Sequence, residues 1–318
     1  MIKSLLYIIT AISFIASSEA KRLEVLFLGD NGSHKPSERF PQIMQGLGPR
    51  GVNFTYTSDP NCLHDGTLEQ FDALMIFANI GQITEEQEKG ILDYVYNGGA
   101  FLPIHCASYC FLNSMKYVKL VGAQFKSHGA GIFKTDIKKP DHPIMKGFKG
   151  FETWDETYVH RLGTNDRNVL QTREGEPWTW TREPGKGRVF YTAYGHDQRT
   201  WGNPGFHDLV HRGLLWAIGE EKSGEFLSSE IPNLVRRDGD LVPNYERRTE
   251  PIKVHIPLNV KDSLKHTQVA NGIDVSLFAS EELGLYSVIE IDWDEKGRAW
   301  VIETRDYPNE LKPAEQGQ

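Results

Sequence analysis

Three histidines follow apolar runs that have the composition of buried β-strands. His34 follows the first such run, His105 comes directly after residues 100–104, and His196 comes just after residues 188–194. Imidazole nitrogens bind divalent metal ions and exchange protons near neutral pH. Histidines at several strand ends therefore indicate metal binding or acid–base chemistry, and the alternative for each is a structural histidine that only makes hydrogen bonds.

Two further candidates lie between the predicted elements. His128 belongs to a glycine-rich stretch that we expect to be a loop, and Glu156 belongs to a segment with neither a helical nor a strand pattern. A set of imidazoles with one carboxylate suits Zn²⁺ or a similar divalent ion that keeps an open coordination position. We predict His105, His128, Glu156 and His196 as metal ligands. Glu156, His196 and His105 are the predicted catalytic groups, with Asp155 supporting Glu156.

Aromatic side chains near these positions offer a second kind of contact. Trp178 and Trp180 are expected either to stack on a sugar ring or to belong to the core, and Trp201 has the same two interpretations. Tyr158 and His34 are further candidates for binding a substrate. The prediction of a ligand site depends on several of these residues meeting at one edge of the fold.

The first half of the chain alternates between short apolar runs and amphipathic segments. One run is almost wholly apolar, as expected for a strand covered on both faces, and Thr84–Gln87 is a capping box that opens a helix. This alternation predicts a mainly parallel sheet with helices on both faces, in which ligands bind beyond the carboxyl ends of the strands. The expected strands are residues 23–29, 52–57, 71–78, 100–104 and 131–137, and the expected helices are residues 36–47, 84–97 and 109–120.

The second half of the main body has a more mixed pattern. Residues 177–182 and 188–194 form a predicted hairpin, and residues 204–218 form a predicted helix that carries His207 and His211. Their spacing of four residues suits metal chelation. The helix is expected to face the core, however, and we interpret both histidines as structural.

The sequence changes character after residue 219. Residues 220–271 are charged, contain several prolines and glycines, and are expected to form a linker. Residues 272–278 and the hairpin 288–303 have strand patterns typical of a β-propeller, which needs at least about four blades. Either further blades lie outside this chain or the hairpin packs back on the first domain.

Composition limits the partners and the compartment. The 318 residues carry a formal net charge of −8, and no basic run is longer than a pair, which argues against a nucleic-acid partner. Lys3, the apolar stretch 5–16 and the small residues in 18–20 have the pattern of a cleaved signal peptide, with an uncleaved anchor helix as the alternative. We therefore expect an exported protein, periplasmic or extracellular, whose mature chain begins at Lys21 and has no transmembrane span.

Six short motifs occur along the main body, and the last of them is the most specific. They are Leu102-Pro-Ile-His105, Phe125-x-x-His128, Asp141-His-Pro143, Trp154-Asp-Glu156-x-Tyr158, Pro177-x-x-Trp180 and Gly185-x-Gly-Arg-Val-Phe-Tyr191 with Gly195-His196. Over about residues 22–219 the chain resembles ThuA-like proteins of trehalose utilisation. This resemblance implies the flavodoxin-like, three-layer α/β fold of class I glutamine amidotransferases and a role in carbohydrate metabolism.

The amidotransferases of this fold carry a nucleophilic cysteine after a strand. Here His105 occupies what corresponds to that position, and Cys106 comes one residue later. The later His-x-Glu pair of those enzymes corresponds to His196-Asp-Gln198, in which an amide replaces the orienting carboxylate. A cysteine nucleophile needs a correctly aimed thiolate and a base within hydrogen-bond reach, so we do not expect glutamine hydrolysis.

The C-terminal tail resembles the start of a propeller domain of the sorbosone-dehydrogenase type, which in related exported proteins can precede a c-type haem domain. This chain has no Cys-x-x-Cys-His sequence, so no covalent haem is expected in it. The predicted organisation is a signal peptide (1–20), a ThuA-like domain (21–219), a linker (220–271) and an incomplete propeller-type segment (272–318).

Together, the candidate site and the resemblance predict an enzyme of carbohydrate catabolism. It would act on an oxidised (keto) sugar or a disaccharide, with a divalent ion such as Zn²⁺ in the His/Glu pocket. Two other functions stay open. A metal-free sugar-binding module would bind its ligand without turnover, and an adaptor would dock a propeller or haem dehydrogenase through residues 220–318.

Overall fold

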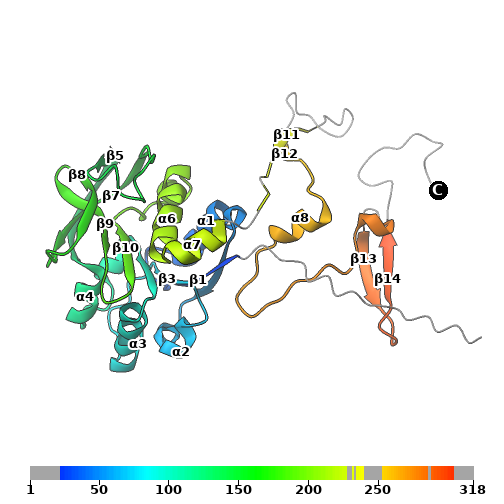
Figure 1. Cartoon of the computed structure of the whole chain (residues 1–318), viewed down its shortest axis with the longest axis horizontal. Helices are drawn as coiled ribbons and strands as arrows, with labels where there is room; N and C mark the ends of the chain where they lie inside the picture. Colours follow the sequence, from blue (N-terminus) through cyan, green and yellow to red (C-terminus); the bar gives the residue numbers. More distant parts are fainter. Residues whose placement is uncertain (1–21, 228–230, 233, 240–252, 286–287, 304–318) are drawn as a thin grey trace, which may run out of the picture.

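The computed structural model describes residues 22–227, 231–232, 234–239, 253–285 and 288–303. The expected signal peptide lies outside the described residues. The main body is a three-layer α/β sandwich, drawn from blue to yellow in Figure 1. The flavodoxin-like fold class predicted from the sequence is confirmed.

An eight-stranded sheet forms the middle layer, in the order β2-β1-β3-β4-β10-β9-β8-β6. The first five strands in this order are parallel, and the last three run antiparallel to their neighbours. β3 and β4 are buried along their whole length, because helices cover both faces and leave no solvated side for polar residues. The strands are β1 (Leu23–Leu28), β2 (Val52–Thr57), β3 (Ala73–Ile76), β4 (Ala100–Pro103), β6 (Asp136–Ile137), β8 (Asn168–Arg173), β9 (Glu176–Arg182) and β10 (Arg188–Thr192).

Helices form the two outer layers (Figure 1). α1 and α6 pack together on one face of the sheet, and α3 and α4 pack together on the other. α3 begins with the expected capping box, in which the Thr84 hydroxyl accepts the N–H of Gln87 and the Gln87 side chain accepts the N–H of Thr84. The helices are α1 (Pro36–Leu47), α2 (Asp65–Leu68), α3 (Glu85–Tyr96), α4 (Met115–Val121), α5 (Gln198–Trp201), α6 (Pro204–Ala217) and α7 (Glu220–Leu227), with 3-10 turns η1 (Gly48–Arg50), η2 (Pro60–Leu63) and η3 (His105–Tyr109).

A separate two-stranded antiparallel ribbon pairs β5 (Gln124–Lys134) with β7 (Glu152–Arg161). It corrects two expectations, because the stretch around His128 and the segment around Glu156 are paired strands and not a loop and an irregular segment. Most of β5 is exposed, so small and polar residues replace the apolar alternation by which a strand is recognised. The helix expected over 109–120 is also shorter, since η3 and a turn precede α4.

The chain beyond the main body contains more regular structure than the expected linker. α7 packs against α6, and a short strand pair and a further helix follow. The strand expected over 272–278 is wrong, because within the described part of the chain no other strand pairs with it. The hairpin expected over 288–303 is confirmed. These later elements are β11 (Arg236–Asp238), β12 (Lys253–His255), α8 (Val260–Lys265), η4 (Glu281–Leu283), β13 (Val288–Trp293) and β14 (Ala299–Glu303).

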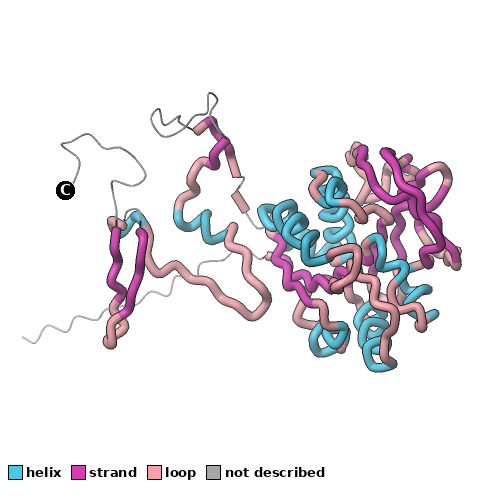
Figure 2. Tube along the Cα trace, turned by 180° about the vertical axis from the view of Figure 1, so that it is seen from behind, coloured by secondary structure: helices cyan, strands magenta, loops and turns pink. Residues whose placement is uncertain are grey.

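The β13–β14 hairpin stands apart from the sandwich in both views of the chain (Figures 1 and 2), so it does not pack back on the first domain. An earlier part of the tail does touch the sandwich. Arg22 donates a hydrogen bond to the carbonyl of Lys265 (2.7 Å), and the main-chain N–H of Asn271 donates to Thr55 Oγ1 (3.0 Å). No helix of the described ranges is long and apolar enough to cross a bilayer.

A histidine-rich candidate site

The parallel strands bring three of the candidate histidines to one edge of the sheet. His34 lies beyond the end of β1, His105 follows β4, and His196 lies beyond β10. The β5–β7 ribbon adds His128 and Glu156, because the register of the two strands places these residues two positions apart. Four of the five candidates line a pocket of about 220 Å³. The residues around it are Ser33, His34, Asn79, Tyr109, Phe125, His128, Glu156, Tyr158 and His196.

The Glu156 carboxylate lies at the centre of the site. Its Oε1 is 3.3 Å from both His128 Nδ1 and His196 Nε2, and its Oε2 is 3.4 Å from His105 Nε2. Burial alone would raise the pKa of Glu156, but the contact with His105 and the neighbouring imidazoles of His196 and His128 outweigh burial and lower that pKa. Glu156 is therefore an anion at neutral pH, available to a metal ion or as a proton acceptor.

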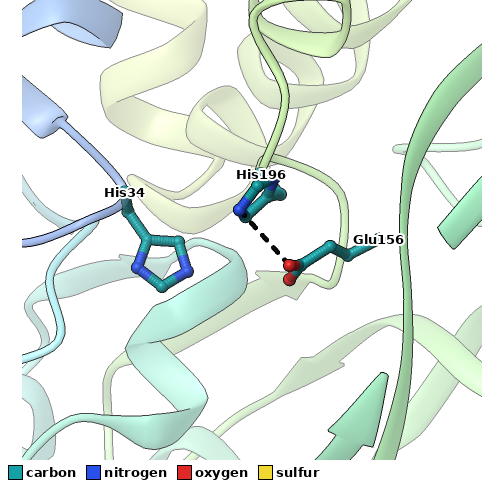
Figure 3. A group of neighbouring side chains, drawn as sticks. All are labelled: His34, Glu156 and His196. Carbon is teal, nitrogen blue, oxygen red and sulfur yellow. Dashed lines mark ion pairs between the residues drawn. The ribbon is translucent and has the colours of Figure 1, made fainter. Parts of the chain in front are cut away.

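A three-residue group has the spacing of a metal centre. The ligand atoms of His34, Glu156 and His196 all lie within 4.8 Å of one another (Figure 3). The His196 Nε2 to Glu156 Oε1 distance is 3.3 Å, close to the separation of roughly 3.3–3.4 Å between two ligands about 2.0–2.1 Å from a tetrahedral ion. Two histidines and one carboxylate leave coordination positions open for a substrate or water.

This grouping differs from the set of ligands expected from the sequence. His34, which we expected to bind substrate, lies within the three-residue group. His105 and His128 contact Glu156 without completing a second such group among the described residues. Burial, together with His105 and His196, lowers the pKa of His34 to about 3, and burial also lowers the pKa of His196. Both imidazoles are therefore neutral near pH 7, which is the form that binds metal.

His105, which contacts Glu156, has an uncommon backbone conformation. Its φ of 47° is left-handed, which costs a residue other than glycine of order 1–3 kcal/mol and persists only where the surroundings impose it. Its Nδ1 lies 2.6 Å from the carbonyl of Ala193, and Tyr158 stacks on its ring with centroids 3.9 Å apart. Nδ1–H therefore donates to Ala193, and Nε2 is left facing Glu156.

Asp155 supports the site through the backbone and not through an imidazole. The side chain is fully buried, and burial raises its pKa. It accepts hydrogen bonds from the main-chain N–H groups of Gly195 (2.8 Å), His196 (3.0 Å) and Asp197 (3.1 Å). Asp155 thus fixes the loop that presents His196, while the next residue of the same strand is Glu156.

Of the two interpretations of the tryptophans, the core interpretation is confirmed and the sugar-stacking wall is wrong. Trp178 and Trp180 are both 0% exposed, and the indole N–H of Trp180 donates to the carbonyl of Val121 at 2.8 Å. A sugar ring in the pocket cannot reach either side chain. Trp201 is buried too, and its indole N–H donates to the carbonyl of Gly195 (2.6 Å) below the His196 loop.

Other aromatic residues form the walls of the pocket. Tyr158 lines it as expected, and Phe125 and Tyr109 line it as well. Phe125 and Tyr158 lie with ring centroids 4.4 Å apart, and Tyr109 meets Phe125 edge-on at 5.3 Å. The sequence contained a signal for Phe125, because this residue stands three positions before His128 in the Phe-x-x-His motif. Asn79, just beyond β3, obeys the same strand-end rule that identified the histidines.

The remaining candidate residues have structural roles. Cys106 is fully buried and burial raises its thiol pKa well above the ordinary value, which disfavours a nucleophilic thiolate. His207 Nε2 lies 2.6 Å from the carbonyl of Trp201, in line with its structural interpretation. The three cysteines are free.

The fold and the edge site define the class of protein: a flavodoxin-type α/β sandwich with a candidate site beyond the carboxyl ends of the strands. Residues 24–217 match the ThuA family, described as trehalose utilisation, and the chain belongs to this family. Membership implies a role in trehalose utilisation or sugar metabolism. Residues 259–318 match a domain of unknown function, DUF7133.

Solved structures of ThuA-like proteins share this fold. A ThuA-like protein from Bacteroides uniformis ATCC 8492 is 18% identical, with a TM-score of 0.57 over 67% of this chain and 98% of that chain. Another, from Parabacteroides merdae ATCC 43184, is 21% identical, with a TM-score of 0.54 over 62% of this chain and 90% of that chain. No curated protein matches the sequence.

Proposed function

We propose that this protein is an enzyme of sugar metabolism whose pocket holds a divalent ion on His34, Glu156 and His196. The observation that carries the proposal is the spacing of these three groups, whose ligand atoms lie within 4.8 Å of one another at the strand-end edge. Neutral imidazoles and an ionised carboxylate are the donor set that Zn²⁺ and similar ions take in catalytic sites. The family membership supplies the link to sugars.

The substrate that suits this pocket is an oxidised (keto) sugar, either free or as one ring of a disaccharide. An ion with open positions polarises a carbonyl oxygen or activates a water molecule. The volume of about 220 Å³ is below the roughly 300–1,000 Å³ of pockets for drug-sized ligands, which favours one ring over two. Phe125 and Tyr109 would stack on that ring, and His105 would exchange a proton through Nε2.

The protein is also proposed to act outside the cytoplasm, in the periplasm or the extracellular space, on the basis of the signal-peptide pattern in 1–20. The tail from 272 onward is proposed to belong to a propeller-type domain or to dock one. The hairpin pattern and the exposed apolar side chains of β13 and β14 support this part of the proposal.

A turnover assay tests the function. The full chain, loaded with Zn²⁺, is incubated with trehalose and with keto derivatives of trehalose and glucose, and products are followed by mass spectrometry. We expect turnover of a keto sugar and a loss of about 10²-fold or more in Glu156→Gln, the range for removing a positioned acid–base group. Lys126→Gln, an exposed change on the same ribbon, is the control and should retain activity.

The same experiment separates the other functions. Saturable sugar binding that survives Glu156→Gln, with no turnover in any variant, would contradict the proposal and support a sugar-binding module. If neither binding nor turnover of any sugar is found, the sugar-active pocket is contradicted altogether and the adaptor becomes the better hypothesis.

A further inference from the structure

A chain of polar side chains crosses the apolar core directly behind the candidate site. Glu176 Oε1 lies 3.0 Å from His160 Nδ1 and also accepts the main-chain N–H of His160 (3.0 Å). His160 Nε2 lies 3.0 Å from the Tyr191 hydroxyl. The side chain of His160 is 2% exposed and Tyr191 is 0% exposed. We name Glu176, His160 and Tyr191 the support chain.

The support chain ends on the backbone of His105. The Tyr191 hydroxyl lies 3.1 Å from the His105 carbonyl oxygen, and Ser108 Oγ donates to the same oxygen at 3.0 Å. The two hydroxyls are 3.0 Å apart. His105 is the residue with the left-handed φ of 47°, and its Nε2 lies 3.4 Å from Glu156 Oε2. The polar chain is thus directed at the strained peptide and not at the pocket, which neither Tyr191 nor Ser108 lines.

Aromatic rings surround the support chain. The Tyr191 ring stacks on Trp180 at 4.1 Å, and His160 meets the same indole edge-on at 5.2 Å. Polar groups are costly to bury in such a place unless each one is hydrogen-bonded. Glu176 accepts the Nδ1 proton of His160 and so fixes the ring with Nε2 facing the Tyr191 hydroxyl. This hydroxyl has one proton, so it donates to the His105 carbonyl in the state in which Nε2 is the donor to the Tyr191 oxygen.

The support chain also links His105 to β7, the strand that carries Glu156. His160 and Glu156 lie four residues apart on β7. Through Tyr191 on β10, His160 holds the carbonyl of His105, while Glu156 meets Nε2 of His105 at 3.4 Å. One strand therefore holds His105 at its backbone and at its ring, which fixes the distance between His105 and the carboxylate.

We propose that Glu176, His160 and Tyr191 are positioning residues that hold the left-handed turn at His105 and thereby orient Glu156 for its ligand. The part that concerns Glu156 rests on the metal site of the proposed function. The part that concerns the turn is independent of it, so the two can fail separately.

The test removes one hydroxyl from the chain. Tyr191→Phe is made in the full chain, and Tyr94→Phe is the matched control, because the Tyr94 hydroxyl donates to the carbonyl of Ala100 (3.3 Å) in a largely buried place on α3. Amide hydrogen exchange is measured without metal at Ala107, whose N–H bonds to Ile104 within the turn. We expect exchange about tenfold faster in Tyr191→Phe only, the factor for one ordinary hydrogen bond.

Cobalt binding supplies the second readout. Co²⁺ alone is titrated into the protein, and its d–d absorption is followed. We expect the Co²⁺ dissociation constant to rise at least about tenfold in Tyr191→Phe, as for residues that orient metal ligands. In Tyr94→Phe it should stay unchanged. His160→Gln, whose amide can still reach Tyr191, should restore part of the affinity that His160→Leu loses.

The outcomes separate the two claims. Equal exchange at Ala107 in wild type and Tyr191→Phe would overturn the positioning role, whatever the metal data show. Faster exchange without any Co²⁺ binding in the wild type would support the turn-holding role and contradict the metal site. Faster exchange with an unchanged Co²⁺ affinity would overturn the orientation of Glu156 through this chain.

Discussion

The two carboxylate oxygens of Asp155 accept hydrogen bonds from different backbone groups, so substitutions that remove one or both oxygens should differ in effect. Oδ1 accepts the main-chain N–H groups of Glu156 (3.0 Å), His196 (3.0 Å) and Asp197 (3.1 Å), and Oδ2 accepts that of Gly195 (2.8 Å). Asparagine keeps the first oxygen and places an NH₂ group against the Gly195 N–H. Alanine removes all four acceptor contacts and leaves the N–H groups to find water.

The expected losses follow from this count. A hydrogen bond to a charged group contributes roughly 1.5–3 kcal/mol, so Asp155→Asn should lower the free energy of unfolding by about 2 kcal/mol. We expect a value near the low end of this range for Asp155→Asn. Burial raises the pKa of Asp155 because the charged carboxylate is costly to desolvate, and the neutral amide of asparagine avoids this cost. Asp155→Ala should lose about 4 kcal/mol or more by the same rule. At about 2–4 °C per kcal/mol, the melting temperature falls by roughly 4–8 °C in the first variant and at least twice as much in the second.

Urea unfolding followed by tryptophan fluorescence measures these differences, and Co²⁺ titration measures the effect on His196. Both variants should bind Co²⁺ more weakly, alanine more than asparagine. Asp197→Asn is the control, since asparagine caps α5 as well as aspartate does, and it should change stability by less than about 0.5 kcal/mol. If Asp155→Ala were as stable as Asp155→Asn, the four-acceptor argument would be refuted.

Two further predictions concern buried groups away from the pocket. Burial lowers the pKa of His211 from 6.5 to about 4 in the folded chain. Below pH 6.5 the unfolded chain binds a proton at His211 that the folded chain does not, so stability is lost as the pH falls from 6.5 toward 4. Between pH 7 and 5 the wild type should therefore lose about 2 kcal/mol more than His211→Leu, and equal losses in urea titrations at both pH values would contradict this. Trp180→Phe removes a buried hydrogen bond and side-chain volume, so it should lower the free energy of unfolding by roughly 2–3 kcal/mol. Calorimetry should show unchanged sugar binding in this variant. Lost sugar affinity at unchanged stability would instead support stacking of Trp180 on the sugar.

The sequence predicted the sheet and its covering helices well, because apolar runs of strand length and helical apolar spacing are local properties. The strand-end rule also located the site, since it places His34, His105 and His196 together at one edge of a parallel sheet. The ribbon β5–β7 was missed, because an exposed strand needs no apolar alternation. Pairing of distant strands, and not local composition, brings Glu156 to the histidines.

Roles within the site were harder to predict than its place. Trp178 and Trp180 alternate with threonine on β9, a pattern that puts both indoles on one side of the strand without telling whether that side is wet or dry. β9 is buried on both sides over most of its length. The left-handed turn at His105 has no signature either, because glycine is the residue that normally marks a positive φ. No sequence motif pairs His160 with Tyr191, because the two residues are 31 positions apart in the chain.

Metal content is the measurement that tests the central claim most directly. The purified full chain is loaded with Zn²⁺, dialysed and analysed for metal in the wild type, His34→Ala and His128→Ala. We predict about one equivalent in the wild type and in His128→Ala, and almost none in His34→Ala. No zinc in the wild type, or equal zinc in His34→Ala, would contradict a metal centre formed by His34, Glu156 and His196.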